Sequence, residues 1–113
     1  MKLVAFEPTR EITHFDSRGA TIAGVARASG EVRVSLLRLD PNGVLGMHPA
    51  TCPQLFLVVA GSGWVRTELE RQPIAAGEAA LWQTGEPHES SADEALTAVV
   101  VEADELELLD EPT

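Results

Sequence analysis

The chain has 113 residues, enough for one domain with a modest core, so we expect a single domain over residues 1–113. Its 18 acidic and 8 basic residues give a net charge of −10, which would repel nucleic acid and anionic membranes and excludes both as expected partners. The only cysteine, Cys52, excludes an internal disulfide. With no signal-peptide pattern at the N-terminus and no apolar run of membrane-spanning length, we expect a cytoplasmic protein.

Nine glycines and seven prolines are spread along the chain, which favours short strands joined by tight turns. We therefore expect an all-β protein. The only segment expected to form even a short helix is the tail, residues 104–109. In chain order, the expected strands span residues 2–6, 20–27, 31–40, 44–48, 55–59, 64–70, 78–83 and 95–103.

Two of these strands are apolar on both faces. Residues 31–40 place valine and leucine on alternating positions and then shift register, which predicts a strand covered on both sides or one with a bulge. Residues 55–59 are uninterruptedly apolar, and alternation places Phe56 on the same inward face as Gln54. The outward face of this strand needs a cover, either from other strands or from a second subunit, and we expect a homodimer.

Polar residues at matched places in two glycine-framed segments are the candidates for chemistry. In the first segment, His48 and Gln54 flank a turn that leads into the apolar strand, which ends at Gly61. In the second, His88 follows the turn that Gly85 marks. These side chains are predicted to meet at the mouth of a β-barrel.

The spacing of these segments resembles the cupins, small jelly-roll barrels (double-stranded β-helices) with the motifs G(X)5HXH(X)3-4E(X)6G and G(X)5PXG(X)2H(X)3N. The first motif falls on His48, Ala50, Gln54 and Gly61, with Asn42 in place of its opening glycine and Gly43 one residue late. The second falls on Gly77, Gln83, Gly85, His88 and Ala92. The resemblance covers residues 32–103 and implies an all-β jelly-roll fold.

The resemblance also implies a metal site, in which three histidines and a glutamate hold a divalent ion inside the barrel. Here Ala50 replaces one of those histidines and Gln54 replaces the glutamate. The remaining metal candidates are His48, Gln54 and His88, a weak donor set for iron, manganese, nickel or zinc. Cys52 lies close by in sequence and is interpreted as a packing thiol or, alternatively, a substitute ligand.

The expected ligand-binding residues are His48, Gln54, Phe56, Trp82 and His88, with Trp82 either narrowing the pocket or belonging to the core. His14 lies outside both motifs, and no catalytic residue is assigned. The favoured function is small-molecule binding with a weakened or absent metal site, as in a sensor or accessory protein. The alternatives are a metal-dependent dioxygenase, isomerase or decarboxylase of the cupin type, and an interaction module with a vestigial pocket.

Overall fold

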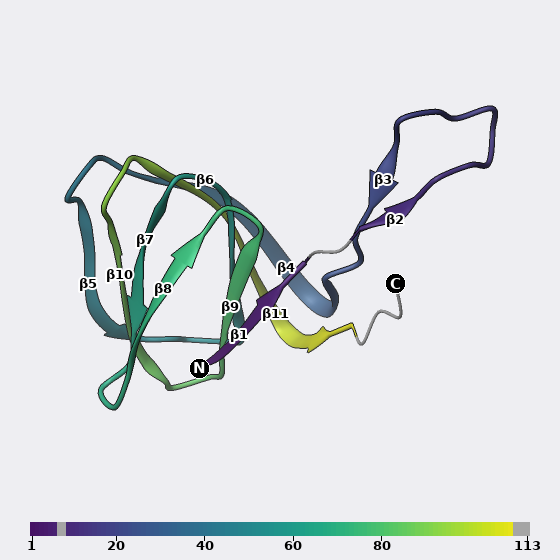
Figure 1. Cartoon of the computed structure of the whole chain (residues 1–113). Coiled ribbons are helices and arrows are strands. Elements are labelled where there is room, and N and C mark those ends of the chain that lie inside the picture. The colour runs from purple at the N-terminus through teal and green to yellow at the C-terminus, as the bar shows by residue number, and fades with distance from the viewer. Residues whose placement is uncertain (7–8, 110–113) are drawn as a thin grey trace.

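A computed structural model describes residues 1–6 and 9–109, and every regular element within those ranges is a β-strand (Figure 1). This confirms the predicted all-β class. The strands are β1 (Lys2–Ala5), β2 (Arg10–Glu11), β3 (Thr21–Ile22), β4 (Ala26–Leu39), β5 (Val44–Pro49), β6 (Gln54–Ala60), β7 (Ser62–Arg66), β8 (Arg71–Ala75), β9 (Glu78–Trp82), β10 (Pro87–Ala92) and β11 (Leu96–Leu108).

Two antiparallel sheets make up the body of the molecule. The larger has the strand order β1-β9-β6-β11-β4, and the smaller has the order β5-β10-β7-β8. The two sheets form the opposed walls of a jelly-roll barrel, as Figure 1 shows. The short strands β2 and β3 pair only with each other, and their hairpin projects away from the barrel.

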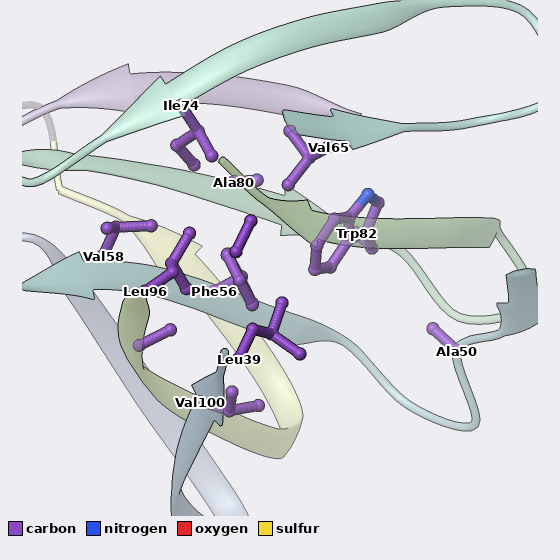
Figure 2. Close-up of a cluster of buried hydrophobic side chains, with 12 residues drawn as sticks. Leu39, Ala50, Phe56, Val58, Val65, Ile74, Ala80, Trp82, Leu96 and Val100 are labelled. Carbon is purple, nitrogen blue, oxygen red and sulfur yellow. The ribbon is translucent and has the colours of Figure 1, made fainter. Parts of the chain in front are cut away.

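The main core fills the space between the two sheets. Phe56 and Val58 of β6 are buried there with Trp82 of β9, Val65 of β7 and Ile74 of β8 (Figure 2). The predicted inward face of residues 55–59 is therefore confirmed. Both sheets contribute apolar side chains, so this burial holds the two walls together.

A second, smaller core lies on the outer face of the larger sheet. Leu55, Ala79 and Leu81 are buried there beneath side chains that include Leu106 and Leu108. The chain itself therefore covers the part of this face around Leu55, Ala79 and Leu81. The helix considered for residues 104–109 is wrong, because the Leu106 and Leu108 alternation extends β11 as a strand that pairs with β4.

Strand β4 is not covered on both sides as predicted, because its outer face is exposed and only Leu37 and Leu39 on its inward face are covered. Val34 and Leu36 on its outer face are 65% and 61% exposed, and β4 forms one edge of the larger sheet. Its register with β11 shifts between Ala103 and Glu105, where Gly30 and Glu31 of β4 lie opposite the single residue Asp104, so the extra residue of this bulge belongs to β4. An apolar strip at an open sheet edge is the result.

The region after β7 also departs from the predicted boundaries. The backbone N–H groups of Leu69 and Glu70 donate to Thr67 Oγ1, which closes a tight turn where a continued strand was expected. The chain then returns as β8, so residues 71–75, which lie between the expected strands 64–70 and 78–83, pair with β7 as a strand of their own. Within the described ranges the model contains no helix, and so none that could cross a bilayer.

Candidate functional site

A cavity of about 200 Å³ opens between the two sheets at one end of the core. All five of the predicted ligand-binding residues line it. Its wall consists of Ser35, Leu36, Leu37, Leu45, His48, Gln54, Phe56, Trp82, His88, Ser90, Val100 and Glu102. The cavity is smaller than a typical drug-binding pocket, which indicates a small ligand.

Strand pairing explains why the polar residues converge there. His48 of β5 lies directly opposite His88 of β10 in the smaller sheet. In the larger sheet, Gln54 at the start of β6 has Trp82 of β9 on one side and Glu102 of β11 on the other. Directly paired residues on antiparallel strands point to the same face, so both sheets present these side chains to the space between them.

The two histidines are held in the same way. Nδ1 of His48 lies 2.6 Å from the carbonyl oxygen of Gly46, and Nδ1 of His88 lies 3.0 Å from that of Glu86. A carbonyl oxygen only accepts hydrogen bonds, so each Nδ1 carries a proton, and in the neutral form of each ring Nε2 keeps a free lone pair. Second partners of this kind commonly fix the tautomer of metal-binding histidines.

His88 is 2% exposed, and its Nε2 is buried without a hydrogen-bond partner. Burial lowers the pKa of His88 below its ordinary value of 6.5, and the neighbouring charge of His48 lowers it further, against the opposing effect of the contact with Glu86. The imidazole is therefore neutral at pH 7. A buried acceptor left unpaired costs about 1–3 kcal/mol, so this atom is suited to a partner in the cavity.

Trp82 forms the apolar wall behind this histidine. Its ring stacks on His88 at a centroid distance of 4.2 Å and an interplanar angle of 22°, and it contacts Phe56 at 5.6 Å. The His88 ring thus lies between Trp82 and His48, whose centroid is 4.4 Å away. Sequence left open whether Trp82 narrows the pocket or belongs to the core, and it does both.

Glu102 is the one charged residue among the lining residues that the sequence analysis did not predict. It lies on β11, outside both motifs, with Gln54 as its cross-strand neighbour. The sequence could have identified it from strand alternation in residues 96–103. There Glu102 lies on the same strand face as Ala98 and Val100 and is the one charged residue on that face. A carboxylate at an otherwise inward, apolar position indicates a functional role.

The other candidates lie outside this cavity. Cys52 lines a neighbouring cavity of about 180 Å³, where its Sγ is 4.0 Å from Glu102 Oε2. Ala50 is buried in the core and does not line the candidate cavity. His14 is exposed on the projecting hairpin.

The donors in the cavity fit a divalent ion only in part. Two imidazole nitrogens, the amide oxygen of Gln54 and the carboxylate of Glu102 line the cavity, and Ala50 contributes no donor. Across residues 1–6 and 9–109, no cluster of three or more histidine, cysteine, aspartate or glutamate residues is placed to hold a metal. Any metal bound here would therefore need further donors from water or from a ligand.

Comparison with solved structures finds proteins with a similar fold. A cupin superfamily protein from Desulfitobacterium hafniense superposes with a TM-score of 0.62 at 11% identity, covering 93% of this chain and 100% of that one. A predicted oxalate decarboxylase from Thermotoga maritima gives 0.57 at 22% identity, covering 67% of this chain and 65% of that one. A salicylate 1,2-dioxygenase from Pseudaminobacter salicylatoxidans gives 0.62 at 14% identity, covering 68% of this chain but 25% of its own.

The chain has the cupin fold. No family model matches its sequence, and no curated protein sequence matches it. At these identities the similarity extends to the fold alone, so the chemistry of this cupin fold has to be inferred from its own side chains.

Proposed function

We propose that this protein binds a small molecule in the cavity between its sheets, as a sensor or accessory protein does, without requiring a metal. The observation that carries the proposal is the buried, unpartnered Nε2 of His88 at the wall of a cavity of about 200 Å³. A few polar groups converging within apolar walls are typical of small-molecule sites. Here Phe56 and Trp82 supply the apolar surface, and His48 and Gln54 supply polar atoms.

The experiment is a thermal-unfolding screen with benzyl alcohol, benzylamine and benzoate as probes. Binding to the native state raises the melting temperature, and a probe at about 100 times its Kd stabilises by roughly 2.7 kcal/mol. Leu45→Trp should abolish the rise, because Leu45 lines the cavity and a larger ring there obstructs it. Val44→Trp is the matched control, since Val44 is its exposed neighbour on β5 and does not line the cavity.

The second candidate is a metal-dependent enzyme, and the matched Nδ1 contacts of His48 and His88 favour it. Oxalate decarboxylase and salicylate dioxygenase among the structural neighbours make decarboxylation or dioxygenation the reactions to test. His48, His88 and Gln54 would hold iron, manganese, nickel or zinc, which would supply Lewis-acid or redox chemistry.

Elemental analysis of protein purified without a metal-chelating column distinguishes the two candidates. About one metal per chain that disappears in His48→Ala would place the enzyme first. Metal-free wild-type protein that still binds a probe would place the binding protein first. His14→Ala is the control, because it removes a histidine that lies on the projecting hairpin.

We further propose that the protein is a cytoplasmic homodimer that pairs through strand β4. The edge position of β4 and the exposed Val34 and Leu36 on its outer face support this pairing. An open apolar edge strand is a template for pairing with another chain, and a twofold contact uses the same surface on both copies.

A further inference from the structure

The charge of the cavity wall restricts what can bind there. Glu102 is the only acidic side chain among the described residues that line the cavity, and no lysine or arginine joins it. A carboxylate ligand would therefore enter a cavity that offers it a like charge and no counter-charge, which costs free energy in a partly buried site.

The hydrogen-bonding groups in the cavity include several that only accept. Nδ1 of His48 and of His88 donates to a backbone carbonyl, so Nε2 of each ring in its neutral form carries a lone pair. Glu102 adds two carboxylate oxygens. Ser35, Gln54 and Ser90 each offer a donor as well as an acceptor, and Trp82 Nε1 is a buried donor without a partner. The groups that only accept pair best with a ligand that donates hydrogen bonds.

Arg33 is the cation that could neutralise Glu102, because the two face each other across β4 and β11. Arg33 and Glu102 both line the neighbouring cavity with Cys52, and of the two only Glu102 also lines the candidate cavity. The described residues show no ion pair between Arg33 and Glu102. The Glu102 carboxylate is therefore available to a ligand.

The apolar part of the wall indicates the remainder of the ligand. Phe56 and Trp82 present aromatic rings, and Leu37 and Val100 present aliphatic side chains. Aromatic rings also attract cations through their faces, so they add to the preference that Glu102 creates. The protein's net charge of −10 favours cations at longer range as well.

We propose that the cavity binds a small organic cation, an amine attached to an apolar or aromatic body, with Glu102 as the residue that determines this specificity. The ammonium group donates to Glu102 and to the histidine Nε2 atoms, and the apolar body packs on Trp82 and Phe56. This inference rests on the proposed small-molecule function, which it narrows to one class of ligand. It disfavours carboxylic acids of the kind that the names of the structural neighbours mention.

The test is isothermal titration calorimetry at pH 7.5 with benzylamine, benzyl alcohol and benzoate, which share one ring and differ in charge. EDTA in the buffer removes any metal that could attract the anion. Charge-assisted hydrogen bonds are about twice as strong as neutral ones, so benzylamine should bind at least about tenfold more tightly than benzyl alcohol. Benzoate should bind more weakly than either.

Two variants test whether the Glu102 carboxylate causes the preference for benzylamine over benzyl alcohol. Glu102→Gln should bring benzylamine to within about twofold of benzyl alcohol. Glu105→Gln removes the same charge from an exposed position on β11 and should keep the tenfold difference. The comparison of probes on the wild type stands even if Glu102→Gln does not fold.

The outcomes separate this inference from the proposed function. Equal binding of benzyl alcohol and benzylamine, or tighter binding of benzoate, overturns the inference and leaves small-molecule binding intact. A preference for benzylamine that survives Glu102→Gln removes Glu102 as its cause and overturns the inference. Failure of all three probes to bind the wild type counts against the proposed function and against the inference that rests on it.

Discussion

The neutral, buried imidazole of His88 should make the stability of the protein depend on pH. Its native pKa lies below 6.5 because of burial, whereas the unfolded chain binds a proton near 6.5. Between those two values the unfolded state holds more protons than the native state. The contribution of His88 is therefore fully present above about pH 6.5 and is lost as the pH falls toward the native pKa.

The size of this loss follows from proton linkage. The limiting case is a His88 that stays neutral in the native state down to pH 5.5. In the unfolded chain at that pH, the protonated form of this histidine outnumbers the neutral form about tenfold. The free energy of unfolding then falls by about 1.4 kcal/mol between pH 7.5 and pH 5.5. This figure is the upper bound for one histidine. The Glu89 carboxyl, whose pKa is lowered by its hydrogen bonds with Arg66, titrates below this window and does not contribute.

Urea denaturation at the two pH values measures the effect. Between pH 7.5 and pH 5.5, the free energy of unfolding of the wild type should fall by up to about 1.4 kcal/mol more than that of His88→Gln, because the variant removes the titrating ring. His14→Gln, which replaces an exposed histidine on the hairpin, should behave as the wild type. Equal losses in wild type and His88→Gln would refute the conclusion that a buried neutral imidazole is present.

Three further predictions concern packing and assembly. Gly63→Ala should destabilise by about 1–3 kcal/mol in urea denaturation, since its Cβ would lie 1.9 Å from the Ser91 carbonyl oxygen. Gly46→Ala, whose Cβ meets nothing within 4 Å, should change stability by less than about 0.5 kcal/mol, and a larger loss than for Gly63→Ala would contradict this packing. Phe56→Ala should cost about 3–5 kcal/mol and lower the melting temperature, because the ring is buried among core side chains. Val34→Glu should convert the proposed dimer into a monomer in analytical ultracentrifugation, because Val34 is exposed on the outer face of β4 and does not line the cavity. A wild type that is already monomeric would refute pairing through β4.

Sequence predicted the fold class and the convergence of the motif residues, because both depend on local spacing. Glycines and prolines mark the turns, and period-two alternation put Gln54 and Phe56 on one face. His48 and His88 lie far apart in sequence, yet each sits beside a turn, and the fold places them opposite each other.

What sequence missed depends on pairing between distant strands. Glu102 lies in the site because β11 pairs with β6 in a register that puts Glu102 opposite Gln54. Residue spacing within a single segment does not reveal such a register. The stacking of Trp82 on His88 required the relative position of two sheets. Exposure of the outer face of β4 was missed for a related reason, because an apolar pattern does not tell which neighbour covers it.

The open face of β4 also sets conditions for handling the protein. At pH 7 the net charge of −10 opposes association beyond the proposed β4 pair, although Val34 and Leu36 are exposed on the single chain. The isoelectric point is near 4.5, and at that pH the repulsion vanishes while the apolar strip is unchanged. Concentrated samples should therefore precipitate on mild acidification before the barrel unfolds, and storage well above pH 6 should preserve defined assemblies.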